Sequence, residues 1–269
     1  MDFLRNGKTP LFAAHRGLSG GNIPCNSRAA FQAALLAGAD IVELDVSISR
    51  DGELFCFHPG MEPAHLDRPE LIKELLAAEV AERYYVNQDD KPTHEKILTL
   101  DEAFEMLKGK CPVNVDKFWT QPKKIADCIR RHGMEKQVIV KTPAKEVYFD
   151  AVEEVAPEMA YMPVIKNEDT VSEQLLGRNI RIVGIEACFE REDAQVVSEA
   201  HIAWLHKNAL ALWGNAIVYN KTSIISAGHT DDLAVTGDPD LGWGWFADKG
   251  FDIVQTDWLP LIRQYFEKR

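Results

Sequence analysis

The sequence has no apolar run that approaches the ~20 residues needed to cross a bilayer. Residues 1–10 are polar and lack the apolar core of a signal peptide. We therefore expect a soluble, cytoplasmic protein without stable membrane insertion. Export is the alternative if a signal peptide has been removed.

Cysteine is scarce, and its spacing is not that of a metal or redox motif. The five cysteines include no C-x-x-C pair, and Cys56 and Cys188 lie in apolar, strand-like runs. An odd number with this placement predicts reduced, mostly buried thiols in a reducing compartment. The sequence also shows no internal repeat and no low-complexity segment.

Basic charge is deficient, with 30 Lys and Arg residues against 42 Asp and Glu residues and a net charge of −12. Nucleic-acid-binding domains are usually basic, so this balance argues against a nucleic-acid partner. If the ligand is an anion, positive charge has to be supplied locally. A bound divalent cation is the simplest source.

Strand-like apolar runs alternate with helical patterns, which is typical of βαβ units around a parallel sheet. The length of 269 residues suits one (β/α)8 barrel domain over residues 1–269, distorted by an insertion at 59–98 that contains a helical piece near 69–84. Nine runs are strand candidates, one more than a barrel uses, and we expect 160–165 or 180–187 to lie outside it. The candidates are 11–15, 40–48, 53–58, 112–118, 138–141, 159–165, 180–189, 210–219 and 251–257.

Helix signals fall between these runs. Ser27 or Asn26 can cap a helix that ends near Gly38, and Thr99 with Glu102 forms a capping box. A second box is predicted at Thr170-x-x-Glu173, and residues 228–245 are rich in turn residues. Further helices are expected at 122–131, 144–155, 192–207 and 260–268.

Polar residues stand at or near the C-terminal ends of eight of the strand candidates, where the active site of a TIM barrel lies. They are His15, Glu43, His58, Asp116, Lys141, Glu186, Asn215 and Asp257.

Glu43 and Asp45 are two residues apart on one strand, so their side chains point to the same face. Two carboxylates that close would repel each other unless a proton or a cation lay between them, which favours a Mg²⁺ or Ca²⁺ site. Asp116 can supply the third carboxylate and Glu186 a weaker fourth. The alternatives are a solvated strand end for the pair, an ion pair with Lys117 for Asp116, and a satisfied core carboxylate for Glu186.

His15 and His58 are candidates for an acid/base pair, because imidazole titrates near neutral pH. Arg16 and Lys141 can hold phosphate oxygens, and Trp213 can form a wall of the pocket. Each has a structural alternative: Arg16 can pair with a carboxylate, Lys141 can lie at a solvated strand end, and Trp213 can lie in the core.

Several segments together carry a family resemblance. They are HRG at 15–17, GADIVELDVSISRDGELFCFHPG at 38–60, LWGNAIV at 212–218 and QTDWLP at 255–260. In this order the chain resembles the glycerophosphodiester phosphodiesterase family, which is related to the phosphatidylinositol-specific phospholipases C. The resemblance implies a distorted TIM barrel that hydrolyses a small phosphodiester with one divalent metal ion, Mg²⁺ or Ca²⁺. It assigns catalysis to His15 and His58, and the metal to Glu43, Asp45 and Asp116.

The chain departs from the family pattern at three places. Cys25 stands where Glu is usual in the Pro-Glu-Asn motif, Pro59 follows His58 in place of Asp, and Asp116-Lys117 replaces Glu-x-Lys. These changes bear on the substrate and the metal more than on the reaction. Activity on a lysophospholipid or a phosphoinositide, or non-catalytic binding of a phosphorylated ligand, are the alternative functions.

Overall fold

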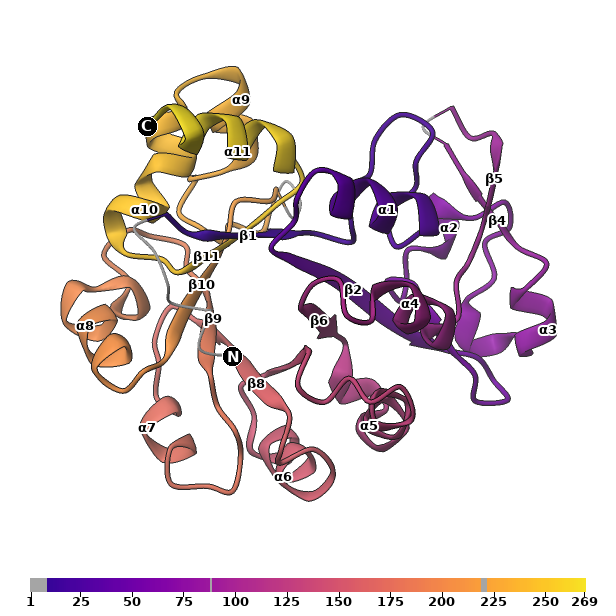
Figure 1. Ribbon diagram of the computed structural model, residues 1–269, viewed down its shortest axis with the longest axis horizontal. Helices are drawn as coiled ribbons and strands as arrows, with labels where there is room; N and C mark the ends of the chain where they lie inside the picture. The colour runs from indigo at the N-terminus through magenta and orange to yellow at the C-terminus, as the bar shows by residue number, and fades with distance from the viewer. Residues whose placement is uncertain (1–8, 88, 219–221) are drawn as a thin grey trace. The chain divides into compact units, whose positions relative to one another are not determined.

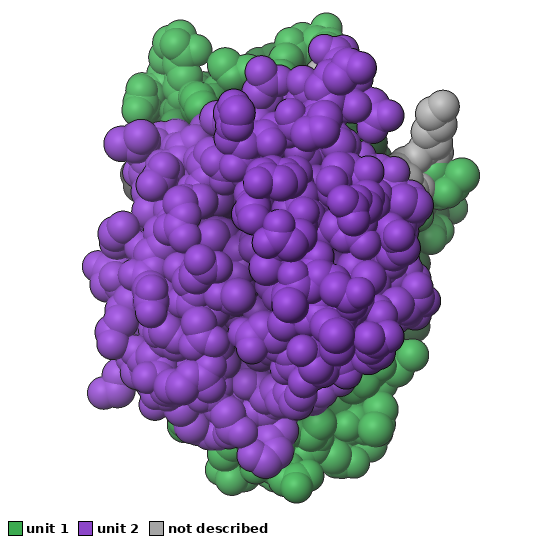
Figure 2. All heavy atoms as spheres, turned by 90° about the vertical axis from the view of Figure 1, so that its right-hand side faces the viewer, with its two compact units in different colours: residues 1–14, 140–269 green, residues 15–139 purple. Residues whose placement is uncertain are grey.

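The computed structural model describes residues 9–87, 89–218 and 222–269, and Figure 1 labels the helices and most of the strands. The chain forms two compact units, which Figure 2 colours separately. Unit 1 comprises the residues up to Ala14 together with Val140–Arg269, and unit 2 is His15–Ile139. The organisation as a single domain stays a prediction.

Unit 1 contains six adjacent strands in the order β1-β11-β10-β9-β8-β7. They are β1 (Leu11–Ala14), β7 (Val138–Pro143), β8 (Ala160–Lys166), β9 (Gly184–Cys188), β10 (Ala211–Asn215) and β11 (Ile253–Thr256). The part of β7 that belongs to unit 1 begins at Val140. The strand predicted at 210–219 ends at Asn215, and its last predicted residue, 219, lies outside the described residues.

The helices of unit 1 follow its strands. They are α6 (Glu146–Val155), α7 (Ser172–Leu175), α8 (Glu199–Lys207), α9 (Asp231–Thr236), α10 (Trp245–Lys249) and α11 (Leu259–Lys268), with a 3₁₀ turn at Gln195–Val197 and a π-helical turn at Asp240–Gly244. The predicted capping box at Thr170 is wrong. Asp169 accepts the backbone N–H groups of Val171 and Ser172 instead, so the acceptor lies one residue earlier. The turn-rich segment 228–245 is largely helical, because Thr230 caps α9.

In unit 2, β2 (Ile41–Ile48) pairs in parallel with β6 (Val113–Asp116) and antiparallel with β3 (Leu54–Cys56). A separate hairpin joins β4 (Tyr84–Val86) to β5 (Pro92–Lys96). The helices are α1 (Arg28–Leu36), α2 (Glu62–His65), α3 (Ala77–Val80), α4 (Leu100–Leu107) and α5 (Pro122–Arg131), with 3₁₀ turns at Ile72–Glu74 and Phe118–Thr120. Ser27 and Thr99 cap α1 and α4 as predicted.

Strands β1, β2 and β6 to β11 alternate with helices along the described chain, so the fold is a (β/α)8 TIM barrel, as predicted. The ninth strand candidate, at 53–58, contains β3, which is not one of these eight strands. The expectation that 160–165 or 180–187 lies outside the barrel is therefore wrong, because both belong to barrel strands β8 and β9. The turn at residues 50–52, with Gly52 at φ 98°, folds β3 straight back on β2 as an antiparallel partner.

The insertion at 59–98 is more ordered than its polar sequence indicates. The predicted helix over 69–84 is wrong, because Leu75 and Leu76 are extended and separate two short helical turns. Two hydrogen bonds join this segment to the turn between β2 and β3. Arg50 N donates to Leu75 O, and Ala77 N donates to the Asp51 carboxylate. Scattered apolar residues form a small core with β3, namely Phe55, Phe57, Leu66, Ile72, Leu75, Val80, Tyr85 and Ile97.

Two expectations from composition can be compared with the structure. Within the described ranges, none of the helices combines the length and the apolar character that crossing a membrane requires. The five cysteines are free thiols, and Cys56, Cys111 and Cys128 are buried, so most of the thiols are buried as predicted.

Candidate active site

Unit 2 brings three acidic side chains together at the ends of two paired strands. Glu43 and Asp45 lie on one face of β2, and Asp116 ends β6 directly opposite Asp45 in the parallel register. One oxygen from each carboxyl group lies within 4.8 Å of the others. Glu43 and Asp45 are buried, so these charges are held close together with little water.

The turn after β1 anchors the first two carboxylates. Arg16 adopts a left-handed backbone with φ 55°; its N–H donates to Glu43 Oε2 at 2.7 Å, and its Nε lies 2.9 Å from Asp45 Oδ2. Gly17 follows at φ 80°, and a Cβ there would lie 2.7 Å from the backbone carbon of Ala30 in α1. The glycine of the HRG motif is therefore required by the close approach of α1.

Asn26 belongs to this cluster, although the sequence suggested only a capping role for it. Its Nδ2 donates to Asp45 Oδ2 at 3.0 Å, and its Oδ1 accepts the N–H of Asp45 at 3.2 Å. The side chain thereby fixes both the backbone and the carboxylate of Asp45. The sequence feature that could have indicated this role is the position of Asn26 in the Pro24-Cys25-Asn26 motif.

Lys117 also joins the cluster, although the sequence suggested only an ion pair with Asp116 for it. Alternation along a strand predicts that Asp116 and Lys117 point to opposite faces. Lys117 is instead left-handed, with φ 62°, and its Nζ lies 2.6 Å from Asp116 Oδ2 and 3.6 Å from Asp45 Oδ1. The ion pair considered as the alternative for Asp116 is thus present, and the strand ends at Asp116.

His58 follows β3 and approaches the same carboxylates. Its Nε2 lies 4.0 Å from Asp45 Oδ1, its Nδ1 lies 3.1 Å from Pro59 O, and its side chain is 16% exposed. His15 belongs to the same unit and interacts electrostatically with Glu43, whose pKa it lowers. Both predicted catalytic histidines therefore adjoin the acidic cluster of unit 2.

The pKa values of Glu43 and Asp45 are shifted in opposite directions. Burial, together with the Asp45 carboxylate, raises the pKa of Glu43 to about 8. Burial acts in the same direction on Asp45, but Arg16 and Lys117 outweigh it and hold the pKa of Asp45 below its usual range. Burial lowers the pKa of His58, so its imidazole is mostly neutral at pH 7.

These donors suit a hard divalent cation. Three carboxyl oxygens within 4.8 Å of one another form an all-oxygen set, which Mg²⁺ and Ca²⁺ prefer. Burial is the main cause of the raised pKa of Glu43, and the neighbouring carboxylates of Asp45 and Asp116 add to it. Arg16 and Lys117 neutralise part of the charge of the cluster.

The other three predicted site residues, Lys141, Glu186 and Trp213, are in unit 1, and they contact each other. Lys141 is 1% exposed, its Nζ lies 2.7 Å from Glu186 Oε2, and the same atom lies 3.1 Å from the centroid of the Trp213 ring. Asn215 Nδ2 donates to Glu186 Oε1 at 2.8 Å. Lys141 is therefore a buried, paired lysine, and the solvated strand-end alternative is wrong.

Trp213 is fully buried, and its indole nitrogen has no hydrogen-bond partner among the described residues. Trp213 is therefore a core residue, which is the alternative to its predicted place in the wall of the pocket.

Comparison with known proteins places the chain in a family. The family model described as "Glycerophosphoryl diester phosphodiesterase family" matches residues 15–194, and a model described as a domain of unknown function matches residues 161–266. A glycerophosphodiester phosphodiesterase of Bacillus altitudinis is 50% identical over 147 residues, which are 50% of this chain and 58% of that protein. One from Caldanaerobacter subterraneus subsp. tengcongensis is 30% identical over 140 residues, 49% of this chain and 57% of that one. The chain thus matches little more than half the length of these curated relatives.

Solved structures share the fold over nearly the whole chain. A glycerophosphoryl diester phosphodiesterase from Parabacteroides distasonis superposes with a TM-score of 0.80 at 16% identity, covering 99% of this chain and 90% of that one. A phosphodiesterase from Oleispira antarctica, solved with the product sn-glycerol-3-phosphate, gives a TM-score of 0.73 at 18% identity and covers 96% and 97% of the two chains. With the match over residues 15–194, the chain belongs to the glycerophosphoryl diester phosphodiesterase family.

Proposed function

We propose that this protein hydrolyses a glycerophosphodiester to glycerol phosphate and an alcohol. The observation that carries the proposal is the group of Glu43, Asp45 and Asp116, of which the first two are buried, with His58 beside it, in a chain of this family. The relatives bear the name of this activity, and one neighbour was solved with sn-glycerol-3-phosphate. A small phosphorylated molecule is accordingly the proposed substrate, and no nucleic-acid partner is proposed.

Glu43, Asp45 and Asp116 would hold the divalent cation, Mg²⁺ or Ca²⁺. When bound, the cation polarises a non-bridging phosphate oxygen and offsets the charge that develops there. Asn26 and Arg16 keep the Asp45 carboxylate oriented through its Oδ2. Arg16 and Lys117 provide the positive charge that a phosphate dianion or monoanion needs in this acidic chain.

The histidines supply the proton transfers. One imidazole of the pair His15 and His58 takes the proton of the nucleophile, which is water or a neighbouring hydroxyl of the substrate. The other protonates the leaving alkoxide. The pKa of His58 is lowered by burial, so its imidazole is neutral at pH 7, the form that can accept a proton. Attack by a substrate hydroxyl would give a transient cyclic phosphate, which water then opens.

The test is release of glycerol phosphate from glycerophosphodiesters by chelator-treated protein, with Mg²⁺, Ca²⁺ or Mn²⁺ added back. We expect activity only with metal, and a loss of roughly 10²–10⁴-fold in rate for His15→Ala and His58→Ala. His94→Ala is the matched control, because His94 is an exposed histidine of β5 in the same unit. A loss below tenfold in both active-site variants would contradict the assignment. No turnover with any of the metals would leave ligand binding as the function.

A further inference from the structure

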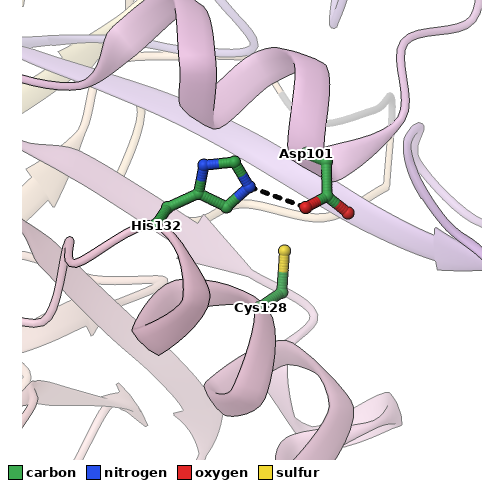
Figure 3. A group of neighbouring side chains, drawn as sticks. All are labelled: Asp101, Cys128 and His132. Carbon is green, nitrogen blue, oxygen red and sulfur yellow. Dashed lines mark hydrogen bonds and ion pairs between the residues drawn. The ribbon is translucent and has the colours of Figure 1, made fainter.

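Unit 2 contains a second group of metal-binding side chains, formed by different elements from those of the acidic cluster. Asp101 lies in the first turn of α4, Cys128 lies in α5, and His132 caps the C-terminal end of α5 (Figure 3). One donor atom from each lies within 4.8 Å of the others. We propose that these three side chains bind a Zn²⁺ ion that ties α4 to α5.

The helix α5 sets the spacing of two of the donors. Cys128 and His132 are four residues apart, so they lie on the same side of the helix, one turn apart. The backbone continues helically to this point, since His132 N donates to Cys128 O at 3.2 Å. The imidazole packs edge-on against Phe104 of α4, with 5.7 Å between ring centroids. That contact holds the ring with its Nε2 toward Asp101 (Figure 3).

Asp101 completes the group and has its own support. Its Oδ1 lies 2.6 Å from His132 Nε2 and accepts hydrogen bonds from Arg131 Nε at 3.2 Å and Nη2 at 2.7 Å, while its Oδ2 accepts one from Nη2 at 2.7 Å. A cation bound at Oδ1 would therefore displace Arg131 from that oxygen, and Arg131 would keep its hydrogen bond to Oδ2. Metal-bound carboxylates are commonly held by such a second hydrogen bond, which orients them. The Asp101 side chain is 35% exposed, so an ion can reach this carboxylate from solvent.

The donor types select the metal. A thiolate, an imidazole and a carboxylate are the ligands that proteins use for Zn²⁺, with water in the fourth position when the protein supplies three. The acidic cluster of Glu43, Asp45 and Asp116 offers only oxygen, which suits Mg²⁺ or Ca²⁺. The site is thus independent of the proposed catalytic function.

The test is a Co²⁺ titration of the full chain in excess Mg²⁺, which occupies the all-oxygen cluster. We expect one equivalent of Co²⁺ to give a thiolate-to-cobalt charge-transfer band in the near ultraviolet, and Zn²⁺ to displace it. Cys128→Ser should abolish the band and weaken binding at least tenfold. Cys111→Ser and Cys25→Ser should leave it unchanged; the first tests another buried thiol, and the second tests the thiol next to Asn26.

A second variant and a second measurement keep the test decisive if Cys128→Ser does not fold. His132→Gln retains the thiol, and it should lose at least tenfold in Co²⁺ affinity together with the rise in melting temperature that Zn²⁺ produces in the wild type. A wild-type protein without a thiolate band would overturn the proposal. So would a band that survives in the folded Cys128→Ser variant, or that disappears in Cys25→Ser.

Discussion

Replacing Lys141 with Met should destabilise unit 1 strongly, because it removes one partner of a buried ion pair. The Lys141 ammonium lies 2.7 Å from Glu186 and 3.1 Å from the Trp213 ring centroid, and the lysine is 1% exposed. Removing one partner of a buried pair costs about 3–5 kcal/mol in the free energy of unfolding. Glu186 keeps its hydrogen bond from Asn215, and its side chain is 14% exposed, so we expect the low end, about 3 kcal/mol.

Thermal unfolding measures this loss. For a chain of this size about 3 kcal/mol corresponds to a melting temperature lower by about 6–12 °C. The matched control adds Glu186→Gln to Lys141→Met, because a neutral amide needs no counter-ion and still accepts the Asn215 hydrogen bond. We expect the double variant to recover most of the lost stability.

Two results would refute this reasoning. A melting temperature for Lys141→Met within about 2 °C of wild type would mean that the pair contributes less than about 1 kcal/mol. A double variant as unstable as Lys141→Met would mean that packing on Trp213, and not charge, supports the lysine. The double variant also tests the predicted phosphate contact of Lys141, since a folded double variant with full activity would exclude that role.

Three further changes have defined outcomes. Burial raises the pKa of Asp231 to about 6, so its stabilising contribution is complete below the unfolded pKa near 4 and disappears as pH rises through 6. Wild type should lose about 3 kcal/mol of stability between pH 4 and 7 that Asp231→Asn does not lose, measured by urea unfolding. Gly17→Ala should lower the melting temperature, because its Cβ would collide with the backbone of Ala30. Asn26→Ala should cost about 1–3 kcal/mol and weaken metal binding by calorimetry, since Asp45 loses two hydrogen bonds. Wild-type stability in Gly17→Ala would contradict the predicted collision, and wild-type stability in Asn26→Ala would contradict the role given to its two hydrogen bonds.

The sequence was sufficient where periodicity and local chemistry act alone. The alternation of strands and helices indicated the barrel, and the two-residue spacing of Glu43 and Asp45 indicated their common face. Capping by Ser27 and Thr99 followed from short-range signals. The helix caps and the common face depend on contacts within a few residues, and the barrel is indicated by the order of its elements, which a single sequence records directly.

The remaining features depend on tertiary contacts or on unusual backbone geometry. Lys117 reaches Asp116 and Asp45 only because its own backbone is left-handed, which strand alternation cannot predict. Asn26 reaches Asp45 across 19 positions of the sequence. The helix expected over 69–84 is broken because the β2–β3 turn takes up backbone groups of Leu75 and Ala77.

The hairpin of β2 and β3 links His58, the proposed catalytic histidine, to the insertion. His58 follows an antiparallel strand held to β2 through the pairs Val46–Cys56, Ser47–Phe55 and Ile48–Leu54. The same strand contributes Phe55 to the small core of the insertion. Exchanging the insertion between relatives would therefore also change the support of His58, so a change in the insertion is expected to alter the proton transfer that we propose for this histidine.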